Sequence, residues 1–361
     1  MAFGDQYPSN LGYLLAKVET TYGTDSVPAA VDFLYTEEKT VTIQTNTEQR
    51  TGVSPNRVGW GAVATNVVGT ASGICEVRPI TIALVTDLPA EDAIWRSCGF
   101  SLVSDIVSDP KTQTYTLQPT EGESATLYSV MLNVGKTEGI LHKLPGFRGT
   151  ITLNITKNER WKLNFEGEGK ACELPKKIDS GTTPPIETGL SDADDLPLVG
   201  TGARVSIFDT VASKAFGGGT EAVPLCEAFV DSADIAFNMG VVRRSAINCS
   251  DGCGGRIELR PGAEYMTGTM VMELTSLDDW DYWAIQAERR PVKIVIEQPV
   301  EASGIDGVRL TFDAELTDFT LADLEGDMAA TCTWIAIYPE DSGEFGTTPA
   351  DLATFVYFTK A

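Results

Sequence analysis

Alternation of apolar and polar residues with a period of two runs through most of the chain, and it constrains the fold more than any other feature. Clear examples are "TITLNI" at 150–155, "PVKIVIEQ" at 291–298 and "VRLTFDAEL" at 308–316. Successive side chains of a β-strand point to opposite faces, so this pattern predicts strands with one buried and one polar face. Gly and Pro separate such segments at regular intervals. The sequence therefore predicts an all-β fold of antiparallel sandwiches or barrels.

Two segments carry helical signals and are expected to flank the sheets. In 86–100, Asp87 suits the N-cap, Pro89 the first turn and Gly99 the position after the last turn. In 276–289, Ser276 and Asp279 have the spacing of a capping box. The expected apolar faces are Ala90, Ile94, Trp95 and Cys98 in the first helix, and Trp280, Trp283, Ala284 and Ala287 in the second.

The order of these elements repeats weakly along the chain. Each helix follows a long strand and is followed downstream by a pair of strands, although the two halves share almost no residue identity. A segment rich in Pro, Gly, Ser, Thr and Asp separates the halves. We therefore expect an N-terminal arm at 1–31, a first β domain at 32–172, a linker or long loop at 173–202, and a second β domain with a C-terminal tail at 203–361.

The charge of the chain limits its partners. The 361 residues include 27 Lys and Arg against 51 Asp and Glu, which gives a net charge of −24. Such a chain has no surplus of cations with which to bind a phosphate backbone. The charge fits either plain solubility or a surface that faces DNA without holding it. The N-terminus lacks the features of a secretory signal, and no stretch is apolar enough to span a membrane.

A search for catalytic, cofactor and metal motifs finds none. The single histidine, His142, is expected to be structural, and no G-x-S-x-G or P-loop pattern occurs. Cys249 and Cys253 lack the partners of a zinc site, so a structural turn is expected. The acidic run at 191–195 lacks the features of an EF-hand and is expected to be solvated. The basic pair Arg243 and Arg244 suggests half of a salt bridge between subunits. We expect no enzyme, no cofactor and no metal.

Several segments resemble one protein family when they are taken in order. "LLAKVETTYGTDSVPAAVDFL" resembles the opening of the tail tube proteins (major tail proteins) of long-tailed, siphovirus-type bacteriophages. "LPAEDAIWRSCGF" resembles that family's short helix ending in "C-G-F". "GILHKLPGFRGTITLNITKNERWKLNFEGEGK" resembles its turn and two strands ending in F-x-G, and "CEAFVDSADIAFNMGVVRR" resembles a strand with an "N-x-V-x-R" exit, here one residue longer. The likeness covers roughly 12–338, without the linker and the C-terminal tail.

The resemblance implies a fold and an assembly. It implies two tandem tail-tube-type β-sandwich or barrel domains, and a ring of three chains with pseudo-six-fold symmetry. Rings would stack into a virion tail tube, assembled in the bacterial cytoplasm, through which DNA passes without specific binding during ejection. The implied partners are other copies of the chain, a tape measure protein, and the tail tip and terminator proteins, with no membrane.

The resemblance also suggests roles for individual residues. The arm would order on assembly and contact the neighbouring ring through Glu19, Thr20, Tyr22, Gly23 and Asp25. Solvent-facing acids would line the bore, and the expected ones are Glu76, Glu166, Glu168 and Asp313.

Two other classes of function stay open at the level of sequence. One is another assembling β-protein, such as a secretion-type tube or a virion decoration protein. The other is a carbohydrate-binding β-sandwich, in which exposed aromatic residues would form a flat platform.

Overall fold

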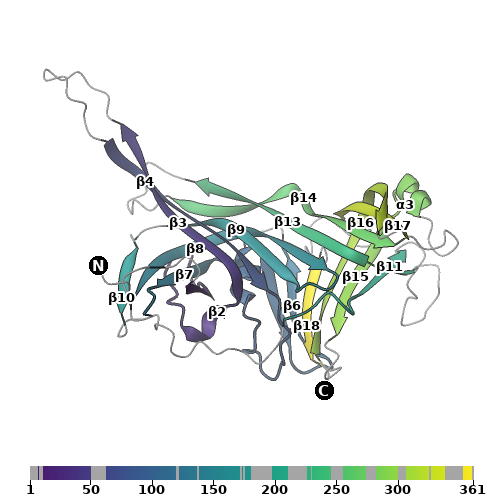
Figure 1. Ribbon diagram of the computed structural model, residues 1–361, viewed down its shortest axis with the longest axis horizontal. Helices are drawn as coiled ribbons and strands as arrows, with labels where there is room; N and C mark the ends of the chain where they lie inside the picture. The colour runs from purple at the N-terminus through teal and green to yellow at the C-terminus, as the bar shows by residue number, and fades with distance from the viewer. Residues whose placement is uncertain are drawn as a thin grey trace.

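The computed structural model describes residues 7, 11–49, 62–118, 122–135, 138–170, 173, 175–179, 197–209, 226–228, 230–244, 255–273, 282–299, 306–324, 327–337 and 353–359. Their regular secondary structure is nearly all β-strand, as the alternation predicts (Figure 1). The first-half strands are β1 (Gly12–Val18), β2 (Phe33–Leu34), β3 (Thr36–Gln49), β4 (Ala62–Glu76), β5 (Phe100–Asp105), β6 (Lys111–Leu117), β7 (Ala125–Leu132), β8 (Glu138–Thr156), β9 (Lys162–Lys170) and β10 (Lys176–Asp179).

The later strands and the helices complete the described fold. The strands are β11 (Arg204–Asp209), β12 (Cys226–Ala228), β13 (Val230–Arg244), β14 (Arg256–Glu273), β15 (Val292–Pro299), β16 (Asp306–Leu324), β17 (Asp327–Ala336) and β18 (Ala353–Thr359). The helices are α1 (Asp92–Ser97), α3 (Tyr282–Glu288) and the short 3-10 helix η2 (Ala30–Asp32). No helix in the described ranges is long and apolar enough to cross a bilayer.

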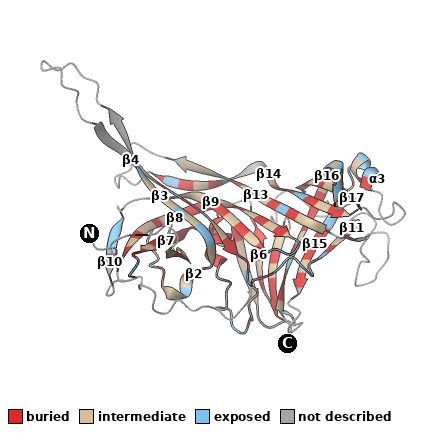
Figure 2. Ribbon diagram, viewed as in Figure 1, coloured by how far each residue is buried: buried red, intermediate tan, exposed pale blue. Residues whose placement is uncertain are grey.

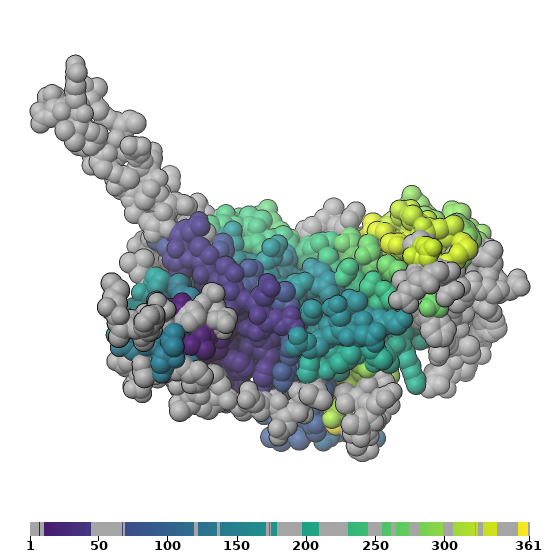
Figure 3. All heavy atoms as spheres, in the orientation of Figure 1, coloured from purple at the N-terminus to yellow at the C-terminus, as the bar shows by residue number. Residues whose placement is uncertain are grey.

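A main antiparallel sheet runs through both halves of the chain. Its order is β3-β4-β9-β8-β13-β14-β17-β16. The halves join where β8 pairs with β13, from Thr156 opposite Ser232 to Ile151 opposite Phe237. In the space-filling view, the colours of the two halves adjoin in one continuous surface (Figure 3).

The halves meet a second time through the last described strand. β18 lies between β6 of the first half and β16 of the second, and β5 pairs with β6. On the other side of β16, β15 leads to β11 and β12. A smaller group of strands, β2-β1-β7-β8-β10, uses the first part of the long β8.

One large hydrophobic core contains side chains from both halves (Figure 2). Trp95 of α1 is fully buried and stacks on Phe355 of β18, with ring centroids 4.7 Å apart. Its ring also meets Phe237 of β13 edge-on at 6.1 Å. Aromatic pairs of this kind contribute beyond their buried area. Among the described residues, the two halves therefore share one core. The expected domain boundaries stay a prediction.

Both expected short helices are present, with some differences in detail. Ile94, Trp95 and Cys98 are buried as expected, and Gly99 has φ 97°, a conformation that favours glycine. The N-cap residue of α1 is Glu91 rather than Asp87. Asp87 instead accepts the backbone N–H groups of Ala83 and Leu84 in the preceding loop.

The apolar face expected for the second helix is only partly the buried face of α3. Trp283 meets Phe319 edge-on with ring centroids 5.4 Å apart and Ala284 is half-buried, but other residues are the most buried ones. α3 buries Tyr282 and Ile285, whereas Trp283 is 42% exposed and Ala287 is exposed. Tyr282 stacks on Phe319 of β16, with centroids 4.2 Å apart. The helix therefore presents to the sheet a face rotated away from the expected one. Trp280 lies outside the described residues.

Residues 11–31, the continuous described part of the expected N-terminal arm, are folded into the body. β1 pairs with β7 over its whole length, and its Leu14 and Leu15 are fully buried. The apolar side chains of "GYLLAKV" explain this, because they cover two hydrophobic clusters at once. Part of the expected linker is also folded, since β10 pairs with β8 and Leu198 is buried in the core.

Candidate functional site

The main sheet has one apolar face and one polar face. On β8, Ile151, Leu153 and Ile155 are buried in the core, so Thr150, Thr152 and Asn154 point to the opposite side. The register carries this mainly polar face across the sheet to Thr70, Ser72, Asn164, Glu166, Asp234, Thr267, Thr269, Thr331 and Thr333. The same face also includes the partly buried apolar residues Ile74, Ala236, Val271 and Ile335. Strands from both halves of the chain therefore contribute to one polar surface.

A row of residues in direct cross-strand register shows how the polar face is organised. Lys162, Asn154, Asp234, Thr269 and Thr333 follow one another on β9, β8, β13, β14 and β17. The amide of Asn154 donates to the Asp234 carboxylate, and the amide of Asn164 donates to the Asn154 oxygen. The Asn154–Asp234 hydrogen bond crosses the junction between the two halves, and the Asn164–Asn154 hydrogen bond joins β9 to β8 beside it.

The exposed charges on this face are mainly negative. Glu166 and Asp234 are exposed, whereas Lys162 forms ion pairs with Glu159 at 3.3 Å and with Glu37 at 3.9 Å. A shallow open groove crosses β3, β4, β8 and β9, and Ser72, Thr150 and Glu166 are among its lining residues. Such a surface offers hydroxyl and carboxylate groups without a deep pocket for a small ligand.

The four acids expected on a bore surface divide into two groups. Glu166 is exposed on the polar face, and Glu168, on the same face of β9, forms an ion pair with Arg243 at 2.9 Å. The expectation that Glu76 and Asp313 face solvent is wrong, since they are 9% and 5% exposed. Glu76 is held inside by Arg78 and Arg160, because a buried carboxylate needs charged partners.

The segment "ETTYGTD" at 19–25 is held in place by the buried carboxylate of Glu19, and we call this segment the anchor. This carboxylate accepts the Gly23 and Gly146 backbone N–H groups at 2.7 and 2.6 Å. It also accepts the hydroxyls of Ser124 and Thr126 at 2.6 and 2.7 Å. The loop is thereby fixed to β7 and β8.

Tyr22 and Asp25 extend the same anchor in two directions. The Tyr22 hydroxyl accepts the Ile257 backbone N–H at 2.6 Å, which joins the loop to β14 of the second half. Asp25 accepts Lys143 Nζ at 2.9 Å and the Tyr128 hydroxyl at 2.5 Å. Gly23 has φ 70° and Thr20 is exposed. The loop is thus ordered within one chain, contrary to the expected ordering on assembly, and its contact with another ring stays a prediction.

Arg243 and Arg244 both have partners within the chain. Arg243 pairs with Glu168, and Arg244 Nε lies 2.6 Å from Glu258. Arg243 is largely buried, while Arg244 is 56% exposed. A role of Arg243 in a bridge to another subunit is therefore not supported by its position.

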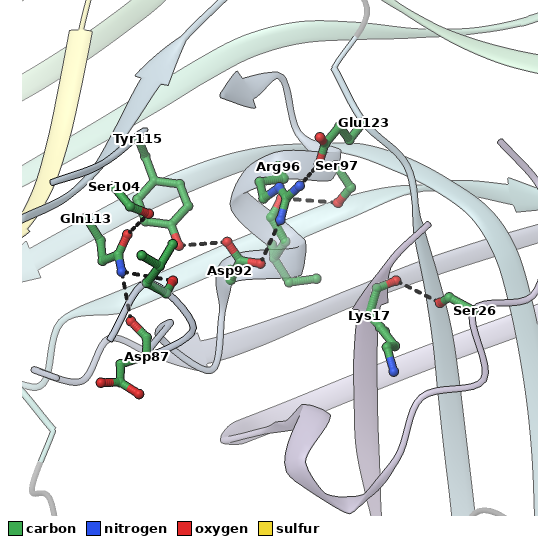
Figure 4. A network of polar contacts seen from close by, with 12 residues as sticks. Lys17, Ser26, Asp87, Asp92, Arg96, Ser97, Ser104, Gln113, Tyr115 and Glu123 are labelled. Atoms are coloured by element: carbon green, nitrogen blue, oxygen red, sulfur yellow. Dashed lines mark hydrogen bonds and ion pairs between the residues drawn. The ribbon is translucent and has the colours of Figure 1, made fainter. Parts of the chain in front are cut away.

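Buried ionisable groups surround α1 and form a structural network (Figure 4). The Tyr115 hydroxyl donates to Asp92 at 2.7 Å, and Arg96 lies between Asp92 and Glu123. Glu91, beside them, accepts the Tyr357 hydroxyl at 2.5 Å. Burial raises the pKa of Glu91 to about 7, so its carboxyl group takes up a proton near neutral pH.

Lys39 and His142 form a second polar region, which is half-buried. Lys39 Nζ donates to the carbonyls of Tyr13 and Val130 at 2.7 and 2.8 Å, which ties β3 to β1 and β7. Burial lowers the pKa of Lys39 to about 7, and burial together with Lys39 lowers the pKa of His142. Neither group faces a nucleophile or a metal-ligand cluster among the described residues.

Three sequence features fall outside the described residues, namely Cys249, Cys253 and the acidic run 191–195. The alternation predicts a polar face for each strand, but it does not show that the polar faces of both halves join in one surface. The signal of these polar faces is present as Thr at every second position in "TIT", "TGT" and "TCT". No protein-family model matches the chain, and no curated protein matches it.

Proposed function

We propose that this chain is a structural subunit that assembles into stacked rings forming the tail tube of a long-tailed bacteriophage. The observation that carries the proposal is the polar face, which is continuous across strands of both halves. A subunit that lines a conduit needs one extended, hydrated and non-adhesive surface. The sequence resemblance to tail tube proteins points in the same direction.

Open sheet edges support assembly as the function. Within the described residues, β3 pairs only with β4, β5 only with β6, and β12 only with β11. Edge strands carry unpaired backbone groups that can join a sheet of another molecule. Three copies, each contributing two similar halves, would close a ring with pseudo-six-fold symmetry around the polar face.

The charge of the polar face supports passage of DNA. Glu166 and Asp234 repel phosphates, and the one lysine in the cross-strand row is neutralised by ion pairs. DNA could therefore move along such a surface without a binding site to stop it. The tape measure, tip and terminator proteins and the virion location belong to the same proposal.

Electron microscopy of the purified, concentrated chain tests the proposal. We expect stacked rings with an open bore and a three-fold or pseudo-six-fold outline in end-on averages. Compact monomers at every concentration would contradict it. Specific binding to a glycan array by such monomers would instead favour the carbohydrate-binding alternative.

A further inference from the structure

A groove lies between α3 and the neighbouring part of β16 (Figure 1). It has a volume of about 520 Å³, which is within the range of small-molecule sites. One aromatic ring and several polar side chains line it, and these are Trp283, Gln286, Arg289, Glu315 and Thr317. We call this space the α3 groove.

The indole ring of Trp283 forms a fixed and exposed wall of the α3 groove. It meets Phe319 edge-on with ring centroids 5.4 Å apart, and it lies beside Tyr282 with centroids 4.6 Å apart. These two rings restrict the orientation of the indole, whereas the residue stays 42% exposed. Trp283 therefore offers a preordered apolar surface on which a flat ligand can stack.

Arg289 occupies a position that favours glycine. Its backbone N–H donates to Gln286 O at 3.1 Å. The next N–H, of Arg290, donates to Ile285 O at 3.0 Å. These two hydrogen bonds form the motif that commonly ends a helix, in which glycine supplies the positive φ that the chain needs. Arg289 has φ 52°, and a side chain in this conformation costs free energy relative to glycine. The end of the helix therefore does not account for an arginine here.

The charges that line the groove offset each other. Arg289 Nε lies 3.6 Å from Glu315 Oε1, which is an ion pair but too long for a hydrogen bond. The two side chains are 81% and 30% exposed. The guanidinium hydrogens and the carboxylate oxygens therefore stay available to a ligand, while the pair adds no net charge. Such a pair suits a neutral ligand with several hydroxyl groups.

A β-bulge in β16 contributes the opposite wall of the groove. The pairing of β16 with β17 shifts between Leu316 and Asp318, so Thr317 is an extra residue in the strand. Its carbonyl accepts the Gln286 amide at 3.2 Å, and its hydroxyl donates to Thr333 O at 3.1 Å. The Gln286 side chain is thereby held at the groove, with a second amide hydrogen and an amide oxygen for a ligand.

We propose that the α3 groove binds a neutral saccharide. One face of a pyranose ring carries C–H groups and stacks on an indole such as that of Trp283. Its hydroxyl groups both donate and accept hydrogen bonds, which matches Gln286 and the Arg289–Glu315 pair. An anionic ligand fits less well, because Glu315 offsets the charge of Arg289. The inference goes beyond the proposed function and does not rest on it.

Isothermal titration calorimetry of the full chain with cellotetraose, mannotetraose and N-acetylchitotetraose tests the proposal. We expect at least one of them to bind with a Kd of about 1 mM or lower. Trp283→Ala should weaken this binding about tenfold or more, and Trp283→Tyr should keep most of it, since a phenol ring also stacks. Leu84→Ala removes another exposed apolar side chain and is the control, which should bind as the wild type does.

Arg289→Gly separates binding from stability. The substitution relieves the positive φ, so thermal unfolding should occur at or above the wild-type temperature. Saccharide binding should nevertheless fall about tenfold, because the guanidinium hydrogen bonds are lost. Val27→Gly is the matched control, since Val27 also has a positive φ of 51° and is 52% exposed. This control should leave binding unchanged.

The outcomes separate this inference from the proposed function. Tubes that bind none of the three saccharides overturn the inference and leave the proposed function standing. Monomers that bind a saccharide through Trp283 support the inference without the tube. Equal binding losses in Trp283→Ala and Leu84→Ala, or unchanged binding in Arg289→Gly, overturn the inference. If Trp283→Ala weakens self-association and no saccharide binds, the groove belongs to a contact between copies and the inference is also overturned.

Discussion

At the residue scale, Glu19 concentrates more interactions than any other side chain in the N-terminal segment. Its two oxygens accept four hydrogen bonds from β7, β8 and its own loop, while the side chain is 7% exposed. All four donors would lose their acceptor at once if the carboxylate were removed. The local order of the segment therefore depends on one acid, although its sequence neighbours look equally polar.

Glu19→Ala is expected to lower the free energy of unfolding by at least about 3 kcal/mol, because it leaves several buried donors unpaired. Urea titration followed by tryptophan fluorescence measures the effect. Thr20→Ala is the matched control, since this neighbouring side chain is exposed, and it should change stability by less than about 0.5 kcal/mol. Equal effects of the two substitutions would contradict the anchoring role of Glu19.

Glu91 makes the stability depend on pH in a definite direction. Its pKa is raised from 4.5 to about 7 in the folded chain, so folding favours the protonated form. This contribution is complete below pH 4.5 and is lost as the pH rises through about 7. Relative to Glu91→Gln, the wild type should lose about 3 kcal/mol over this range. Unfolding titrations at several pH values test this, with the exposed Glu288→Gln as control.

At the scale of elements, the two helices illustrate what sequence patterns reveal and what they miss. The first helix is predicted from Asp87, Pro89 and Gly99, and the second from the capping-box spacing of Ser276 and Asp279. α1 and α3 lie within the two expected segments. The buried face of α3 depends on which strand lies beneath it. Tyr282 stacks on Phe319 of β16, and the sequence around the helix does not show which strand lies beneath it.

The two helices also differ in how much they stabilise the fold. Trp95→Ala is expected to cost about 3–5 kcal/mol, because the ring is fully buried against aromatic residues of both halves. Trp283→Ala should cost less than about 1 kcal/mol, since this ring is 42% exposed. Thermal unfolding of both variants makes the comparison. A larger loss for Trp283→Ala than for Trp95→Ala would contradict the greater contribution of α1 to stability.

Strand pairings over long sequence distances explain most remaining differences between expectation and structure. The strands themselves follow from the period-two pattern. The pattern cannot show that "GYLLAKV" pairs with β7 or that β18 enters between β6 and β16. For the same reason, Glu76 and Asp313 look like exposed acids in alternating strands, although neighbouring segments cover them.

At the scale of the whole molecule, the polar face predicts a response to added positive charge. Glu166→Lys combined with Asp234→Lys should increase binding of duplex DNA at low salt, because lysines on this surface would release counterions from the backbone. Gel-shift titration measures the change. Glu173→Lys with Glu288→Lys changes the charge equally at other exposed sites. Similar DNA binding by both double variants would show that net charge, rather than this face, controls repulsion.

The position of β18 has a consequence for how the chain is made. Tyr357 on this strand meets Glu91 across 266 residues of sequence, and Phe355 covers Trp95. While a ribosome is still translating the intervening segment, β6 has β5 but not β18 beside it, and the side of Trp95 that stacks on Phe355 stays uncovered. Such non-local pairing slows folding and leaves unpaired strand edges that can associate with other nascent chains. A chain that ends before β18 therefore leaves one edge of β6 and the Phe355-facing side of Trp95 uncovered.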